Sequence, residues 1–418
     1  MSAKKERRCS DIPGLCSIRL FLYSVGVNLN LGYIMWLFRS GLVLLAYVGI
    51  NIYTGIRIFA LLKYFFPSVR GLFFWPLYIL FCYSFIWMMQ VRVTWLRPLR
   101  QVGMNSLPVL FYFFLVLIVL DILRLVLRYS GIIPHGGAYS AAGTGIALGI
   151  AVIVMVYGAF HARAIHTAHY EITVEKDKGA PPLRIVLVSD LHIGSTVGRK
   201  WTARIVDAVN RAGPDVICLA GDIFDGNIDT TPDLEGVGEE LRRLSAPLGV
   251  FACQGNHDVD RFSFREEGRT DRIYDFLKTV NIDFLLDEVV LVAERFYLAG
   301  RKDARPIGSS QGRKTAAELV SGFDASRPII FLDHQPVDFP AEDKAGADLI
   351  LSGHTHRGQF FPGNAATKRI YKNLGAVHYG YWRGTSAQGV VSSGAGVWGP
   401  PIRIATRSEV VVIDIDFN

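Results

Sequence analysis

The sequence predicts membrane-spanning helices followed by an α/β sandwich, in which β-sheet is flanked by helices. Two observations lead to this fold class. Long uncharged apolar stretches crowd roughly the first two-fifths of the 418 residues, and the whole chain is 50% hydrophobic and 19% charged. From about Glu171 onward, short strand-like runs alternate with helical patterns, which is typical of an α/β domain. We therefore expect a membrane domain in residues 1–165 and a second domain in residues 166–418.

Four stretches are long and apolar enough to cross a bilayer, which takes about 20 residues of helix. They are Gly41–Leu62, Leu72–Val91, Leu107–Leu127 and Gly143–Phe160. A further uncharged stretch, Leu20–Phe38, contains Asn28 and Asn30, and only Arg39, Ser40 and Gly41 separate it from the next span. Because this separation is too short for a helical hairpin, we interpret Leu20–Phe38 as an interfacial helix or a possible fifth span.

The cations near these spans predict the orientation, because short loops that stay in the cytoplasm are enriched in Lys and Arg. The loop between the first two spans holds only Lys63 and Arg70. The opposite side, before the first span and after the second, holds Lys4, Lys5, Arg7, Arg8, Arg19, Arg39, Arg92, Arg97 and Arg100. This bias predicts that both chain ends, and therefore the second domain, are cytoplasmic.

The cysteines and the net charge exclude several classes of protein. The five Cys are scattered and never spaced as CxxC, which argues against a disulfide framework or a Cys-bound zinc and fits a reducing compartment. The net charge of +7 would suit a nucleic-acid partner. However, the cations cluster beside the apolar spans, and no basic stretch interleaved with aromatic residues occurs in the second domain. We therefore expect the bilayer, and no nucleic acid, as a partner.

The second domain is predicted to begin with the strand Glu171–Val174, after a linker from His161 to Tyr170. Apolar runs predict further strands, and helical periodicity predicts helices between them. The strands are Arg184–Val188, Val216–Ala220, Val250–Cys253, Ile329–Leu332, Leu349–Leu351, Gly389–Ser392 and Val410–Ile415, and the helices are Lys200–Ala212 and Arg272–Val280.

Four short motifs follow apolar runs of this domain and place ligand-type side chains at strand ends. They are DLH (Asp190–His192), GDIFD (Gly221–Asp225), GNHD (Gly255–Asp258) and GHTH (Gly353–His356). A buried carboxylate is costly unless it meets a cation or several donors. Mixed imidazole and carboxylate ligands suit Mn, Fe or Zn better than Mg or Ca. The motifs together therefore predict a site for two divalent metal ions, most simply Mn, with Fe or Zn as alternatives.

In this order, the motifs resemble those of the calcineurin-like metallophosphoesterases, over roughly the last three-fifths of the chain. The resemblance implies a sandwich of two mixed β-sheets flanked by helices. It also implies a first metal held by Asp190, His192 and His356, a bridging Asp222, and a second metal held by Asn256, His334 and His354. His257 is then a catalytic residue that faces the phosphate, and Asp225 orients it.

The resemblance further implies a metal-dependent phosphoester hydrolase. A hydroxide that bridges the two metals attacks phosphorus, and His257 stabilises the developing charge or protonates the leaving group. The chain differs from the protein phosphatases of this family at one position that bears on the substrate. In protein Ser/Thr phosphatases the second motif continues into an Arg that grips phosphate, whereas this chain has Gly226. A phosphoprotein substrate is therefore disfavoured.

The tail, from LSGHTHRGQFFP to IRIATRSEVVVI, resembles a bacterial membrane-associated phosphodiesterase branch and is similar to UDP-2,3-diacylglucosamine pyrophosphatases. This similarity implies a bacterial inner-membrane enzyme that cleaves a phosphodiester or pyrophosphate in a lipid or lipid-linked substrate. Arg357 either touches the substrate phosphate or is a solvated loop residue. Four aromatic residues could line an acyl or base pocket, although we favour packing of the loops: Tyr379, Tyr381, Trp382 and Trp398.

Two other functions remain open on the sequence. The chain could be a transporter or sensor with a regulatory phosphoesterase-like domain, or it could be a nucleotide or nucleic-acid phosphodiesterase. The complete ligand set favours an enzyme, because a regulatory domain would tolerate the loss of ligands. The predicted spans also lack the run of central charges that would mark an ion path.

Overall fold

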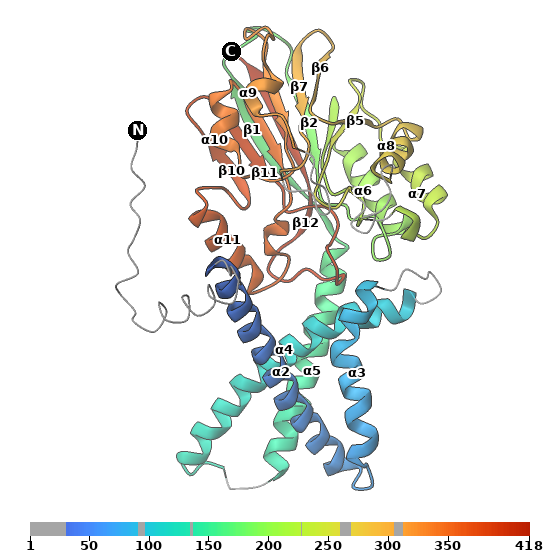
Figure 1. The fold of residues 1–418 in the computed structure, drawn as a ribbon, viewed down its shortest axis with the longest axis vertical. Helices are drawn as coiled ribbons and strands as arrows, with labels where there is room; N and C mark the ends of the chain where they lie inside the picture. Colours follow the sequence, from blue (N-terminus) through green and yellow to red (C-terminus); the bar gives the residue numbers. More distant parts are fainter. Residues whose placement is uncertain (1–30, 91–96, 134–136, 227, 260–268, 305–311) are drawn as a thin grey trace, which may run out of the picture. The chain divides into compact units, whose positions relative to one another are not determined.

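The computed structural model describes residues 31–418, except for residues 91–96, 134–136, 227, 260–268 and 305–311 (Figure 1). The chain divides into two compact units. The described part of the first unit comprises residues 31–78 and Leu117–Gly145, and the second unit comprises Ile79–Val116 and Ile146–Asn418.

Within the described residues, four long helices precede the first strand: α2 (Leu31–Phe65), α3 (Gly71–Gln90), α4 (Arg97–Tyr129) and α5 (Gly137–Ala162). Three segments within them are long and apolar enough to span a membrane, namely Gly41–Phe65, Gln101–Tyr129 and Tyr139–Ala162. They confirm three of the predicted spans as apolar helices. The described apolar part of α3, Gly71–Phe85, is shorter, so a fourth span stays a prediction.

The stretch Leu20–Phe38 lies partly outside the described residues. From Leu31 onward it belongs to α2, which runs through Arg39 and Gly41 to Phe65 without a break. No Pro interrupts this segment, and a single helical Gly costs only about 1 kcal/mol, so the helical hydrogen bonds continue. The predicted separation of this stretch from the following span at Arg39 to Gly41 is therefore wrong.

An ion pair joins two helices inside the first unit. The guanidinium of Arg57 in α2 lies 3.1 Å from the carboxylate of Asp121 in α4, and Arg124 lies 3.5 Å from the same oxygen. Arg57 also donates to the hydroxyl of Thr144 at 3.1 Å, and Tyr53 donates to Asp121. Charged groups within apolar helices are stable only when they are paired in this way.

The α/β domain contains two six-stranded mixed sheets, as the fold prediction requires. The strand order is β1-β12-β2-β3-β4-β5 in the first sheet and β10-β11-β9-β8-β7-β6 in the second. Figure 1 shows α6, α7 and α8 beside one face of this pair of sheets, and α9 and α10 beside the other. The domain is thus a four-layer sandwich.

The bounds of β3, β4 and β8 match the predicted apolar runs. The strands are β1 (Ile165–Val174), β2 (Leu183–Val188), β3 (Val216–Ala220), β4 (Val250–Cys253), β5 (Asp283–Leu285), β6 (Glu288–Val292), β7 (Phe296–Gly300), β8 (Ile329–Leu332), β9 (Leu349–Ser352), β10 (Gly380–Arg383), β11 (Gln388–Val391) and β12 (Ser408–Phe417). The helices are α6 (Arg199–Arg211), α7 (Leu234–Leu241), α8 (Arg269–Thr279), α9 (Ala316–Leu319), α10 (Phe339–Lys344) and α11 (Gly363–Asn373), with short 3₁₀ turns η3 (Ile228–Thr230) and η4 (His356–Gly358).

Three apolar cores separate the layers. The central core joins the two sheets through residues such as Leu187, Cys218 and Leu351, and the outer cores pack the helices onto each sheet. Strands β2, β3, β4, β8 and β9 lie between neighbouring strands and are buried along nearly their whole length. This burial explains why they appear in the sequence as continuous apolar runs rather than as alternating patterns.

The last apolar helix continues into the sheet almost directly, since only Arg163 and Ala164 lie between α5 and β1. The predicted ten-residue linker from His161 to Tyr170 is wrong, because β1 already begins at Ile165 and pairs with β12 along its whole length. The end of α5 is also packed into the domain. The carbonyl of Gly158 accepts a hydrogen bond of 3.0 Å from the backbone of Arg403.

We expect Gly158→Leu to destabilise the α/β domain. A Cβ atom at this position would lie 3.0 Å from Ile404 and 3.2 Å from Ile402, and overpacking of this kind costs about 1–3 kcal/mol. Thermal unfolding of the detergent-solubilised protein measures the change. Gly149→Leu in the same helix is the matched control, because no atom lies within 4 Å of its added Cβ. Equal unfolding temperatures for the two variants would contradict the packed junction.

Candidate metal centre

The predicted site residues follow the carboxyl ends of neighbouring strands in the two sheets. Asp190 and His192 follow β2, Asp222 follows β3, and Asn256 follows β4. His334 follows β8, and the His354 and His356 motif follows β9. Several of these residues adopt left-handed backbone angles, with φ of 53° at Asp190, 52° at Asp222 and 72° at His354. Such conformations cost energy in non-glycine residues and are concentrated at functional sites.

One group of ligand-type atoms comprises Asp190, His192 and His356, whose ligand atoms lie within 4.8 Å of one another. The Nε2 atoms of His192 and His356 are 2.9 Å apart, and Nε2 of His356 lies 3.5 Å from the Asp190 carboxylate. The backbone of His354 donates to both Asp190 oxygens at 3.0 Å, which fixes the carboxylate.

A second group comprises Asp222, His334 and His354. Nε2 of His334 lies 3.2 Å from Asp222 and 3.2 Å from Nδ1 of His354. The amide oxygen of Asn256 joins this group, at 2.8 Å from Nδ1 of His354 and 3.2 Å from Nε2 of His334. Asp222 also lies 3.5 Å from Nε2 of His192, so its carboxylate stands between the two groups.

These residues fit two divalent cations. Two ligands bound to one ion at about 2.0–2.2 Å lie roughly 3 Å apart, which is the separation of the imidazole nitrogens in each group. Asp190 and Asp222 are 0% and 2% exposed, and within the described residues neither has a Lys or Arg in ion-pair contact. Buried carboxylates without such partners require other cations.

The pKa shifts of His354 and His356 suit metal binding. The pKa values of His192 and His334 are instead raised, because nearby carboxylates outweigh the effect of burial. Burial, assisted by the positive charge of His334, lowers the pKa of His354 to about 3. Burial and the neighbouring His192 likewise hold the pKa of His356 well below its usual value. Burial raises the pKa of Asp190, although His334 opposes this effect. At neutral pH both His354 and His356 are therefore neutral, which is the state that binds a metal.

A third group places Asp225 beside two imidazoles. Its carboxylate lies 3.2 Å from Nδ1 of His257 and 3.6 Å from Nδ1 of His192. Burial would raise the pKa of Asp225, but the neighbouring rings of His192 and His257 hold it below its usual range. Asp225 therefore carries a negative charge that orients both rings. The structure thus brings all the predicted site residues together, and their individual roles as ligands stay a prediction.

Two contacts behind the ligands were not predicted from the sequence. Nδ1 of His334 lies 2.8 Å from the carbonyl of Ala220, which directs Nε2 of the ring into the cluster. The fully buried Arg403 donates to the carbonyl of His356 at 3.2 Å and to the carbonyl of Gly396 at 2.8 Å. The only signal for Arg403 in the sequence is a cation between apolar residues.

A cavity of about 440 Å³ opens at this cluster, and its lining includes the aromatic residues Phe360 and Trp398 and also Thr367. Trp398 is 49% exposed, and its ring centroid lies 6.4 Å from that of His257. The expectation that the four aromatic residues only pack the loops is therefore wrong for Trp398. It holds for Trp382, whose ring packs on Phe339 at 5.2 Å.

Arg357 and Gly226 directly follow predicted site residues in the sequence, but neither is among the residues that line this cavity. The Arg357 guanidinium stacks over the ring of Tyr379 at 4.2 Å, and its side chain is partly exposed, so both of its predicted roles stay open. Gly226 has a φ of 86°, a conformation that an Arg would adopt only with strain.

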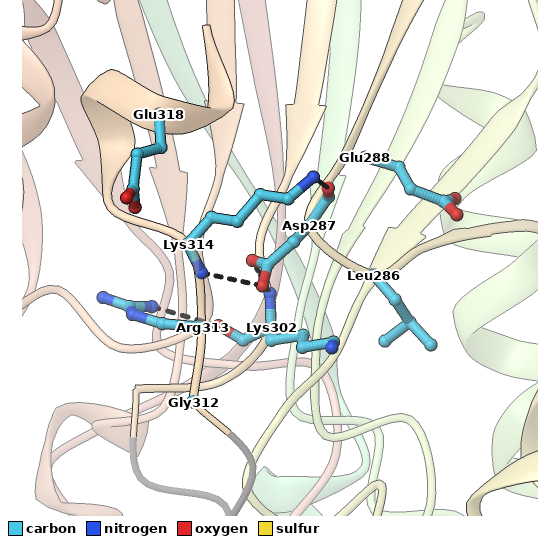
Figure 2. Close-up of a pocket in the computed structure, with 8 residues that line it drawn as sticks. All are labelled: Leu286, Asp287, Glu288, Lys302, Gly312, Arg313, Lys314 and Glu318. Carbon is cyan, nitrogen blue, oxygen red and sulfur yellow. Dashed lines mark hydrogen bonds between the residues drawn. The ribbon is translucent and has the colours of Figure 1, made fainter.

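A second cavity, of about 670 Å³, lies away from the cluster and is lined by Asp287, Lys302, Arg313 and Lys314 among others (Figure 2). Several of its polar groups already have partners. The Asp287 carboxylate accepts backbone hydrogen bonds of 3.0 Å from Lys302 and 2.9 Å from Lys314. Arg313 binds Asp333 at 3.0 Å. This cavity therefore offers a weaker site for an anion than the histidine cluster does.

Comparisons with known proteins agree with this chemistry. A family profile described as "Calcineurin-like phosphoesterase" matches residues 183–358. A "Transmembrane protein with metallophosphoesterase domain" from Danio rerio is 33% identical over 65% of this chain and 62% of that protein. An "Uncharacterized metallophosphoesterase" from Campylobacter jejuni is 30% identical over 56% of this chain and 59% of that protein. The chain thus spans about three-fifths of the length of these relatives.

Among solved structures, a dimetal phosphatase from Danio rerio aligns with 56% of this chain and 99% of its own, at 15% identity and a TM-score of 0.30.

We expect Asp222→Asn to lose metal from both groups and to abolish nearly all turnover, because its carboxylate contacts both. His257→Ala should keep both metals and slow the hydrolysis of an aryl phosphodiester by about two to four orders of magnitude. Elemental analysis and rate measurements on the same preparations test both variants. Two retained metals with wild-type turnover in Asp222→Asn, or a lost metal in His257→Ala, would overturn these assignments.

Proposed function

We propose that this chain, whose residues 183–358 form a domain of the calcineurin-like metallophosphoesterase family, hydrolyses a phosphodiester or pyrophosphate bond in a lipid or lipid-linked substrate. The domain is that of a metal-dependent phosphoester hydrolase. The observation that supports the proposal most strongly is the position of Asp222, which lies 3.5 Å from His192 and 3.2 Å from His334 and so joins the two ligand groups.

Two divalent cations, held by Asp190, His192 and His356 and by Asn256, His334 and His354 with Asp222 shared, would supply Lewis-acid activation of water and phosphate. The mixed donor set favours Mn, with Fe or Zn as alternatives. The chain itself supplies the orientation of these groups. Burial excludes bulk water from Asp190, Asp222 and His334, so their electrostatic contacts are only weakly screened.

His257 is the proposed proton donor to the leaving oxygen. Its ring lines the cavity, and the Asp225 carboxylate, 3.2 Å from Nδ1, fixes the orientation of the ring. The backbone of His257 also donates a hydrogen bond of 2.7 Å to Asp222, which holds the ring at a set position relative to the ligand groups. A positioned donor of this kind accelerates hydrolysis by about two to four orders of magnitude.

The proposal of a lipid-linked substrate is supported by how closely the domain follows an apolar helix. With only Arg163 and Ala164 between α5 and β1, the catalytic domain has no flexible tether. An enzyme confined to the bilayer gains effective concentration only for a substrate that shares that surface. The aromatic side of the cavity at Phe360 and Trp398 would accept an apolar or planar group. A phosphoprotein substrate is disfavoured, because this chain has Gly226 in place of the Arg that grips phosphate in protein Ser/Thr phosphatases.

A substrate panel tests the proposal with the full-length protein reconstituted in vesicles and supplied with Mn. We expect a nucleotide-lipid pyrophosphate in the same vesicles to be cleaved at least tenfold faster than a soluble short-chain analogue at equal total concentration. Asp222→Asn is the inactive control. Faster cleavage of the soluble analogue would contradict a lipid substrate, and preferred cleavage of DNA or RNA would favour a nuclease. No hydrolysis by protein with two bound metals would favour a regulatory domain.

We further propose that the catalytic domain faces the cytoplasm at a bacterial inner membrane. The support is the excess of Lys and Arg before the first predicted span and between the second and third, compared with only Lys63 and Arg70 between the first two. A reporter fused after Asn418 decides the side. We expect fluorescence from a cytoplasmic reporter and no alkaline phosphatase activity, whereas the opposite pair of results would reverse the orientation.

A further inference from the structure

The surface around α11 carries an unusual excess of positive charge. Residues 349–408 contain no Asp or Glu, although the chain has 37 acidic and 44 basic residues in all. Within this stretch, α11 exposes Lys368, Arg369 and Lys372. None of these three makes an ion pair with another described residue. The positive charge of this helix is therefore available to an external anionic partner.

This helix and its C-cap residue also expose large apolar side chains. Ile370 is 56% exposed and Leu374 is 65% exposed, while Tyr371 is buried. Positions four apart share one side of a helix, so Ile370 and Leu374 form an apolar flank and Lys368 and Lys372 form a cationic flank. A helix that exposes both kinds of flank is typical of segments that lie in the interface of a bilayer.

The segment that leads into α11 contacts the apolar helix α4 directly and the apolar helix α5 through Ile404. The hydroxyl of Tyr112, in the candidate span of α4, donates a hydrogen bond of 2.8 Å to the carbonyl of Phe361. The backbone of Phe361 donates to the carbonyl of Ile404 at 3.1 Å, and Ile404 packs against Gly158 of α5. Phe361 is itself 50% exposed. These contacts hold the start of α11 beside helices that are long and apolar enough to cross a membrane.

We propose that α11 is a second membrane contact, which docks on the anionic surface of the bilayer that the spans cross. The docking surface consists of an apolar part and a cationic part: Phe361, Ile370 and Leu374, and Lys368, Arg369 and Lys372. The apolar side chains enter the interface, and the cations bind lipid phosphate groups. Each cation near an anionic leaflet strengthens binding by about fivefold, so the three together contribute about a hundredfold.

Docking of α11 has a consequence for the cavity, and this consequence rests on the proposed function. Gly363 and Thr367, in the first turns of α11, line the cavity at the metal ligands. A docked α11 therefore keeps one wall of the cavity at the lipid surface. A phosphate group of a lipid-linked substrate then reaches the metal ligands without leaving the bilayer. The docking itself does not depend on which substrate is cleaved.

A spin label at Ile370→Cys tests the docking without any measurement of activity. The full chain is reconstituted in phosphatidylcholine vesicles with or without phosphatidylglycerol, and collisions of the label with oxygen and with a water-soluble nickel chelate are compared. Cys9 and Cys16 are replaced by Ser, whereas Cys82, Cys218 and Cys253 are buried and unreactive. A label at Phe323→Cys, outside the docking surface, serves as the water-exposed reference.

In vesicles with phosphatidylglycerol, we expect the label at position 370 to be shielded from the nickel chelate and open to oxygen. Lys368→Glu/Arg369→Glu/Lys372→Glu should lower the docking equilibrium by about a hundredfold or more and expose the label to water. The control Lys178→Glu/Lys278→Glu/Lys344→Glu changes the net charge equally at exposed positions elsewhere and should leave the label shielded.

Three results would overturn the proposal. The first is a label that stays open to the nickel chelate in every vesicle. The second is shielding that is the same with and without phosphatidylglycerol and insensitive to the α11 variant. The third is shielding that appears only when RNA or a soluble protein is added, which would assign the surface to that partner. No turnover is measured in this experiment. The result for docking is therefore independent of whether the proposed hydrolysis is correct, and a failure of one can be told apart from a failure of the other.

Discussion

The burial of two carboxylates at adjacent strand ends is the constraint on which the rest of the structure depends. Asp190 and Asp222 are almost fully enclosed, and among the described residues they contact imidazoles, backbone amides and the hydroxyl of Ser189. Such an arrangement is stable only with added positive charge. It also demands close backbone approach. A Cβ at Gly255 would lie 2.1 Å from the backbone nitrogen of Asp222, and one at Gly353 would lie 2.5 Å from the Asp190 carboxylate. The two motif glycines are therefore required by the carboxylates that they approach.

Arg403 connects the buried ligand cluster to the apolar helix α5. Arg403 donates from its backbone to the carbonyl of Gly158 in α5 and from its side chain to the carbonyl of His356. A buried guanidinium that binds only carbonyls and an imidazole is costly to maintain, and burial lowers the pKa of Arg403 to about 10. The hydrogen bonds of Arg403 offset part of this cost, and they hold the loop that bears His356 in place. The ligand cluster and the end of α5 are thus parts of one packed unit.

The strands that enclose the site could be predicted because each is buried on both faces and so appears as a continuous apolar run. Strands β3, β4 and β8 begin and end where the sequence predicts. The short strands β5, β6 and β7 were not predicted from the sequence. Helix α11 was also missed. It begins with Gly, Asn and two Ala and buries only Tyr371, so its position is decided by packing on the domain and by the cavity that its first turns line.

The sequence by itself determined the class of fold, the apolar helices and the set of residues that gathers at the strand ends. These features depend on local apolar runs and on motifs a few residues long, which the chain order alone makes visible. Only the tertiary structure decided that Trp398 lines the cavity while Trp382 packs on Phe339, that Arg403 supports His356, and that Arg357 stacks on Tyr379. Each of these outcomes depends on contacts between residues far apart in the sequence, and such contacts form only when both sheets are closed around the site.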